Sequence, residues 1–122
     1  MIYLTRAEEQ IMKVLWKLEN AFIKDIVDRL PKPKPAYNTV STVVRILEKK
    51  KIVSYEAFGK THRYFPLISK EQYTKQQSSG LLKNYFDGSV HKIVSHFSAN
   101  KLIDLKELDA TIKLLNSLKK KK

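Results

Sequence analysis

The chain has 122 residues, 43% of them hydrophobic, which suits one packed domain or a small domain with an appendage and excludes global disorder. Lysine and arginine number 24 against 12 acidic residues, and the net charge of +12 favours a polyanion as partner, nucleic acid before a membrane surface. Cysteine is absent, which excludes disulfides and thiolate metal sites, and no apolar run approaches the roughly 18 residues of a membrane span, so we expect a soluble cytoplasmic protein without membrane insertion.

The first part of the chain predicts two helices. Thr5-Arg-Ala-Glu8 matches a capping box, in which two side chains bind free backbone N–H groups at a helix start. Apolar residues then recur at helical spacing until about residue 19. Phe22-Ile23 is a candidate for a very short strand, and a second helix is expected over residues 24–30. The proline-rich stretch 31–35 ends that helix, because proline lacks the backbone donor that a helix needs.

The stretch that follows the prolines has two different faces. Valines and Leu47 recur at helical spacing and can face a core, whereas the other face carries short polar groups and one guanidinium. We expect Asn38 to be the N-cap of a helix over residues 39–50. Such donors and acceptors at the start of a helix suit base edges and phosphates. The candidate DNA-reading residues are Asn38, Thr39, Ser41, Thr42 and Arg45.

A basic hairpin is predicted directly after this helix. Strand formers fill residues 52–58 and 61–65, and Gly59-Lys60 makes the turn between them. Helices followed by a basic hairpin are the order of a winged helix, a DNA-reading module of the helix-turn-helix type. Residues 1–66 are therefore interpreted as a winged-helix DNA-binding domain, in which Lys60 and Arg63 on the wing contact phosphates.

Residues 67–122 are predicted to be helical, so the whole chain is mainly α with a small β-hairpin. Three short amphipathic helices make a poor independent core, and a symmetric second copy is the simplest cover for their apolar faces. We interpret residues 67–122 as a dimerisation arm; the alternative is a monomer in which these helices fold back on the first domain. The last helix, capped by Asp104, carries the dimerisation stripe Leu105, Leu108, Ile112 and Leu115.

The bland interpretation of the candidate residues is that they are ordinary exposed helix-start residues. A cap explains Asn38 but not Ser41 and Thr42, which are mediocre helix formers. Arg45 either reaches a base or phosphate or pairs with Glu48. For Lys60 and Arg63 on the wing, the alternative to phosphate contact is that they are simply solvated at the hairpin tip. Tyr37 is expected to pack beneath the helix rather than stack on a sugar, and residues 49–51 to add positive field rather than specificity.

No motif predicts catalysis or metal binding. The three histidines lie far apart, and no carboxylate or cysteine cluster stands at ligand spacing. With three glycines in all, the chain has neither a phosphate-binding glycine loop nor a nucleophile elbow. We expect no enzyme activity, no cofactor and no metal.

Three blocks of sequence, in order, resemble the BlaI/MecI type of penicillinase and methicillin-resistance repressors. They are residues 4–16, 39–50 and 59–66. The resemblance implies a dimer in which each winged helix binds half of a palindromic operator while the C-terminal helices interlock. It also implies induction by a membrane metalloprotease sensor that cuts an Asn-Phe bond. In the aligned stretch Phe97 matches, but His96 stands where asparagine is typical.

Two further departures from that family are visible. Lys51 stands where many relatives have a glycine that closes the third helix; a cation near a helix C-terminus is favourable. Copper-responsive relatives carry a C-terminal cysteine cluster, which this chain lacks. The sequence therefore predicts a sequence-specific, homodimeric repressor on double-stranded operator DNA. The alternatives are a winged-helix protein-interaction module and a non-specific architectural DNA binder.

Overall fold

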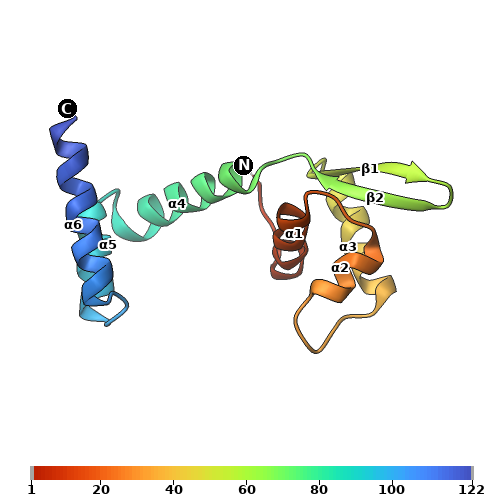
Figure 1. Cartoon of the computed structure of the whole chain (residues 1–122), viewed down its shortest axis with the longest axis horizontal. Helices are drawn as coiled ribbons and strands as arrows, with labels where there is room; N and C mark the ends of the chain where they lie inside the picture. The colour runs from red at the N-terminus through yellow and green to blue at the C-terminus, as the bar shows by residue number, and fades with distance from the viewer. Residues whose placement is uncertain (1, 122) are drawn as a thin grey trace. The chain divides into compact units, whose positions relative to one another are not determined.

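The computed structural model describes residues 2–121, and within them it contains six helices and one two-stranded antiparallel hairpin (Figure 1). The prediction of a mainly α chain with a small β-hairpin is confirmed. The elements in chain order are α1 (Arg6–Leu18), α2 (Ile23–Arg29), α3 (Tyr37–Lys49), β1 (Val53–Phe58), β2 (Thr61–Pro66), α4 (Lys70–Phe86), α5 (Val90–Ala99) and α6 (Leu105–Lys120).

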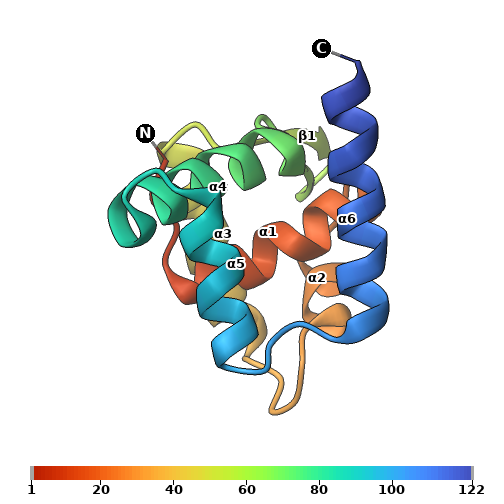
Figure 2. The same ribbon diagram turned by 90° about the vertical axis from the view of Figure 1, so that its left-hand side faces the viewer.

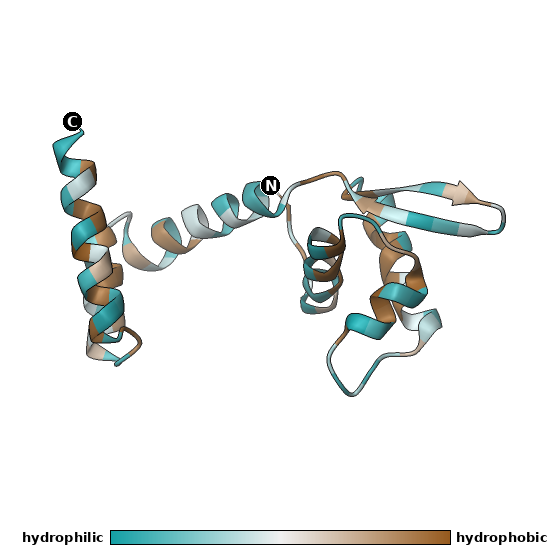
Figure 3. Ribbon diagram, viewed as in Figure 1, coloured by the Kyte–Doolittle hydropathy of each residue, from teal (hydrophilic) through white to brown (hydrophobic). Residues whose placement is uncertain are grey.

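The first three helices and the hairpin share one hydrophobic core. Apolar residues one helical turn apart on α3 turn inward together with the buried stripe of α1, and the brown segments in Figure 3 mark both stripes. The side chains that are fully enclosed are Met12, Leu15, Ile26, Val40, Val44, Leu47 and Val53. This core orients the polar face of α3 away from the interior.

The capping box at the start of α1 is confirmed. The Glu8 N–H donates to the Thr5 hydroxyl over 3.1 Å, and the Thr5 N–H donates to the Glu8 carboxylate over 2.8 Å. Glu8 is only 3% exposed, and its carboxylate also binds Lys50 Nζ over 2.8 Å. Lys50, which the sequence suggested only adds to the positive field, therefore ties the end of α3 to the start of α1.

The Glu8 carboxylate should make stability depend on pH. Burial raises the pKa of Glu8, but hydrogen bonds from Lys50 and the Thr5 N–H, with the Lys50 charge, outweigh burial and lower it below its ordinary value. A lowered pKa contributes stability above the unfolded pKa near 4.5, and that stability is lost as pH falls through the folded pKa.

We expect Glu8→Gln to reduce the free energy of unfolding at pH 7 by about 2 kcal/mol, the scale of a hydrogen bond to a charged group. The variant should then lose less stability than the unmodified chain as pH falls below about 4.5. Urea unfolding at several pH values measures both effects. Glu71→Gln, at an exposed position of α4, is the matched control, and equal pH profiles for all three proteins would contradict the linkage.

The expected short strand at Phe22-Ile23 is wrong. The bridging residue is Ala21, which exchanges two backbone hydrogen bonds with Tyr64 over 2.9 and 2.8 Å. Phe22 instead precedes α2, and its N–H donates to the Asp25 carboxylate over 3.1 Å. That local bond starts the helix at Ile23, immediately after the bridge.

Asn38 is not the N-cap of α3, contrary to the prediction. The helix begins at Tyr37, and the cap is Ala36, whose carbonyl accepts from the Val40 N–H over 3.1 Å without any side-chain cap. The Asn38 backbone is therefore already inside the helix, and its side chain is not needed as a cap.

Lys51 closes α3 in a conformation that favours glycine. Its φ is 62°, and the Lys51 and Ile52 N–H groups donate to the carbonyls of Glu48 and Leu47, each over 3.0 Å. This is the Schellman arrangement, in which a residue with a Cβ is strained by about 1–2 kcal/mol.

We expect Lys51→Gly to raise the free energy of unfolding by about 0.5–1 kcal/mol, since relief of this strain exceeds the entropic cost of glycine. Thermal or urea unfolding measures the change. Lys49→Gly, one charge lost inside the regular helix, is the matched control and should destabilise by about 1 kcal/mol. A Lys51→Gly variant as unstable as Lys49→Gly would refute the interpretation.

The predicted wing is confirmed as a hairpin. Tyr55 pairs with Tyr64 and Phe58 with Thr61, so the turn consists of Gly59 and Lys60. Gly59 has φ 63°, which a residue without a Cβ adopts freely at a two-residue turn. Lys60 is thereby held at the tip of the wing.

Backbone contacts divide the chain into two units, and the boundary lies inside α4, between Gln77 and Ser78. The first turns of α4 stay with the first unit because three sets of contacts hold the adjoining chain there. Trp16 Nε1 donates to the Ile68 carbonyl over 2.9 Å, the Tyr73 hydroxyl to Glu9 over 2.7 Å, and Gln76 exchanges two hydrogen bonds with the Ile2 backbone. The boundary therefore falls later than the one suggested after residue 66.

In the second unit, α5 and α6 run in opposite directions and are joined by a short loop (Figure 2). The side chains of Ser89 and Asp104 cap them, accepting from Lys92 and Glu107 N–H over 3.1 and 2.8 Å, so the predicted Asp104 cap is confirmed. None of residues 78–121 is fully buried. Within residues 2–121, no helix combines the length and apolar character needed to cross a membrane.

Candidate nucleic-acid interface

The polar residues of α3 lie on the surface of the first unit. Asn38, Thr39, Thr42 and Arg45 are exposed and Ser41 is partly buried. On the opposite face of the same helix, Val40, Val44 and Leu47 are buried in the core. The fold therefore presents these donors and acceptors outward along one helical face.

The amide of Asn38 and the hydroxyl of Thr42 differ in what they can still bind. Because Ala36 caps the helix, the Asn38 amide is not used for capping. The Thr42 hydroxyl donates to the Asn38 carbonyl over 2.9 Å, which leaves its oxygen as an acceptor. An exposed amide offers a donor and an acceptor side by side, the arrangement that pairs with an adenine edge.

One hollow joins α3 to the wing and to the start of α2. It has a volume of about 300 Å³, and we call it the wing hollow. Three predicted site residues, Ser41, Arg45 and Lys60, line it together, whereas Asn38, Thr39 and Thr42 do not. Its lining residues are Phe22, Ile23, Lys24, Tyr37, Ser41, Arg45, Lys60, Thr61, His62 and Tyr64.

The wing hollow is electropositive. No acidic residue lines it, and its cations come from three elements: Lys24, Arg45 and Lys60. Ion pairs within residues 2–121 take up Lys13, Lys50, Arg63 and Lys92 but none of these three, so no ion pair joins Arg45 to Glu48. Tyr64 forms the buried end of the hollow; burial raises the pKa of its phenol, the Glu48 charge raises it further, and Arg45 opposes the rise.

Arg63 does not line the wing hollow. It stands opposite Glu56 in the hairpin, and its Nη2 lies 3.3 Å from the Glu56 carboxylate. Its guanidinium also lies over the Phe58 ring, 4.7 Å from the centroid. Since exposed ion pairs of this kind are weak, phosphate contact by Arg63 stays a prediction.

Sequence reasoning missed five polar residues of this hollow, one of them the buried Tyr64. Tyr37, expected to pack beneath the helix, is 54% exposed and lines the hollow instead. His62 stacks on Tyr55 with ring centroids 3.9 Å apart, and Thr61 and Lys24 complete the set. Thr61 and His62 follow the predicted Lys60 in the sequence, so their place beside it could have been inferred. No sequence pattern points to Lys24, because only the fold brings the start of α2 to the wing.

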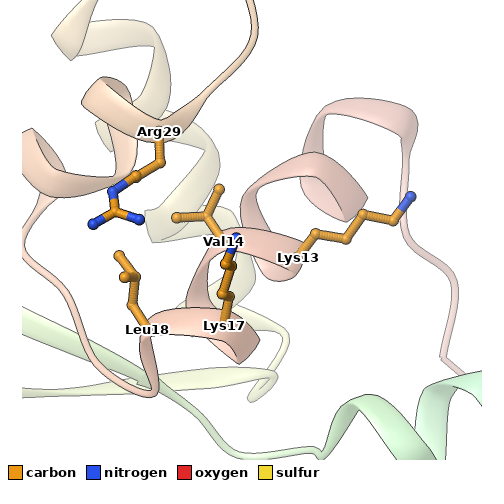
Figure 4. A pocket seen from close by; sticks show the side chains of 5 residues that line it. All are labelled: Lys13, Val14, Lys17, Leu18 and Arg29. Atoms are coloured by element: carbon orange, nitrogen blue, oxygen red, sulfur yellow. The ribbon is translucent and has the colours of Figure 1, made fainter.

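A second basic hollow lies elsewhere on the first unit, with a volume of about 220 Å³ (Figure 4). Val14 and Leu18 form its apolar part, and Lys13, Lys17 and Arg29 surround it. Lys13 also pairs with Glu9 over 3.4 Å. This α1 hollow contains no residue of α3 or of the wing, so it provides a comparison for the charge of the wing hollow.

The predicted dimerisation stripe is mostly exposed. Leu105, Ile112 and Leu115 lie on the surface of α6, together with Leu114 and Leu118, which the prediction omitted. Leu108 is partly buried and lines a hollow with Val94 and Phe97 of α5. Of the predicted stripe, Leu108 therefore packs within the second unit, whereas the other three residues are exposed in it.

The predicted cutting point, His96-Phe97, lies within α5 rather than in a loop. His96 is exposed and faces Phe86, with ring centroids 5.5 Å apart, while Phe97 is partly buried. Among the described residues 2–121, no cluster of histidines and carboxylates could hold a metal ion.

The sequence matches the penicillinase repressor family over residues 4–117. The penicillinase repressor of Bacillus licheniformis is 25% identical over 95% of this chain and 91% of its own length. That of Staphylococcus aureus is 22% identical over 98% of this chain and 96% of its own. Among solved structures, BpsR of Bordetella bronchiseptica has a TM-score of 0.52 at 14% identity, covering 95% of this chain and 80% of that chain, which is a likeness of fold.

Proposed function

Since the chain belongs to the penicillinase repressor family, whose members are DNA-binding transcriptional repressors rather than enzymes, we propose that it represses transcription as a homodimer on a palindromic operator. The observation that carries this proposal is the outward polar face of α3 beside an electropositive hollow. Base edges require donors and acceptors, and the DNA backbone requires unpaired cations. One surface of the first unit offers both.

In the proposed complex α3 enters the major groove, with Asn38, Thr39, Ser41 and Thr42 at the bases. The wing and Arg45 reach the flanking backbone, where Lys60 contacts phosphate. Two such modules read half-sites about 34–36 Å apart, one helical turn of DNA. A dimer bound in this way represses by blocking RNA polymerase.

The proposal of a dimer rests on the second unit. The second half of α4 together with α5 and α6 contains no fully buried residue, and most leucines of α6 are exposed: Leu105, Leu114, Leu115 and Leu118. Three such helices are too small to be stable without further burial, and a second copy supplies it symmetrically. The dimer in turn raises the effective concentration of the second winged helix at its half-site.

Induction by cleavage is part of the same proposal. A membrane metalloprotease sensor would cut between His96 and Phe97, which would separate α6 from the winged helix. Because this bond lies in a helix, α5 has to unwind locally before a protease can bind it as an extended chain. Loss of α6 would dissociate the dimer and release the operator.

Footprinting on the chain's own promoter, followed by affinity measurements on the protected sequence and on random DNA, tests the function. We expect a palindromic footprint and at least a 10³-fold preference for it. Affinity should fall steeply between about 50 and 200 mM salt, as phosphate contacts require. Equal affinity for random DNA would indicate the architectural binder, and no salt-dependent DNA binding would indicate the protein-interaction module.

A further inference from the structure

The wing hollow brings together cations that are far apart in the sequence and unpaired in the structure. Lys24 comes from α2, Arg45 from α3 and Lys60 from the turn of the wing. Like charges repel, and no acidic residue lines the hollow to offset them, so three cations around one hollow favour an anion that joins them. The α1 hollow differs, because there Lys13 has a carboxylate partner.

The remaining donors of the wing hollow suit an oxyanion. Ser41 offers a hydroxyl and His62 a ring N–H, whose plane is fixed by stacking on Tyr55 at 8°. Thr61 is not a donor, because its hydroxyl already donates to the Phe58 carbonyl over 2.8 Å. Charged and neutral donors converging from several elements are the usual surroundings of a phosphate.

We propose that the wing hollow seats one phosphate of the DNA backbone, clamped between Lys24, Arg45 and Lys60. This inference rests on the proposed function, and it assigns to Lys24 and His62 a role in fixing the position of α3. A clamp between the helix and the wing sets how deeply and in which register α3 enters the groove, since phosphate contacts orient a protein on the duplex. One phosphate in each half-site should therefore matter more than its neighbours.

The test uses operator duplexes in which one phosphate per half-site is replaced by an uncharged methylphosphonate. Scanning this replacement with the unmodified chain should reveal one position that costs about tenfold in affinity. Lys24→Ala should cost a similar factor on natural DNA and lower the slope of log K against log salt by about 2 for the dimer. When Lys24→Ala is tested on the duplex with the methylphosphonate at the sensitive position, the loss of affinity should be little more than for either change alone.

Lys17→Ala, which removes the same charge from the α1 hollow, is the matched control. Its effect should be smaller than that of Lys24→Ala and should add to the effect of the replacement at every position. The clamp would be overturned if the two variants lost equal affinity, or if the loss for Lys24→Ala added to that of the phosphate replacement at every position. In either case, a retained preference for the operator over random DNA would leave the proposed function standing. Loss of operator preference in the unmodified chain would overturn both.

A free oxyanion is the other source of the same chemistry. Inorganic phosphate, added at constant ionic strength, should not displace the operator if the hollow takes a phosphate of the duplex, because the DNA presents it with many other contacts. Displacement of the unmodified chain at millimolar phosphate, absent for Lys24→Ala, would show a free-anion site and overturn the assignment to the DNA backbone.

Discussion

Ile112→Ser should convert the proposed dimer largely to monomer and weaken operator binding correspondingly. Ile112 is 48% exposed on α6 within a single chain, and in the proposed dimer a second copy covers it. Covering the exposed half of an isoleucine contributes about 0.7–1.5 kcal/mol, and a symmetric interface loses this twice. A loss of about 1.5–3 kcal/mol corresponds to roughly a 10- to 100-fold weaker dimer.

Sedimentation at several protein concentrations measures the dimer directly, and operator titration measures the consequence for DNA. The fold should persist, because isoleucine and serine have similar helix propensities and Ile112 is not part of a buried core. Leu67→Ser is the matched control, since Leu67 is 52% exposed but lies in the first unit. A dimer of unchanged strength in Ile112→Ser would remove α6 from the interface.

Asn38→Ala should reduce operator affinity by about 10- to 100-fold while leaving affinity for random DNA nearly unchanged. An amide paired with a base edge contributes about 1–3 kcal/mol of discrimination, whereas random DNA is held through phosphates. The observed cap at Ala36 makes this test clean. If Asn38 were the cap, alanine would also cost about 1 kcal/mol of stability, but inside a helix alanine is favourable.

The two DNAs have to be compared at one salt concentration, because both affinities change steeply with salt. Asn84→Ala, at an exposed helical asparagine of α4, is the matched control and should leave both affinities unchanged. Equal losses on operator and random DNA for Asn38→Ala would mean that the residue contacts the backbone rather than a base. An unchanged operator affinity would remove Asn38 from the reading face.

Several elements could be predicted because their causes are local. The capping box at Thr5, the cap at Asp104 and the turn at Gly59-Lys60 each depend on residues within three or four positions, and the structure confirms them. Apolar periodicity likewise placed α3 and its inward face. Belonging to the penicillinase repressor family was evident from blocks that stand in order along the chain.

Two of the predictions that failed involve partners far away in the sequence. The third does not: Asn38 is a good cap by type, but α3 already begins at Tyr37 with Ala36 as its cap. The strand expected at Phe22-Ile23 moved to Ala21, because the pairing partner is Tyr64. Lys50 meets Glu8 across 42 positions, which no local pattern reveals.

The residue types needed to read DNA follow from the order of amino acids, since a helix of known periodicity assigns Asn38 and Thr42 to the face opposite its valines. Which charges act together does not follow from it. Lys24, Arg45 and Lys60 share a hollow only because α2, α3 and the hairpin pack around one core. Arg63, three residues beyond Lys60, is directed to Glu56 by the alternation of side chains along a strand.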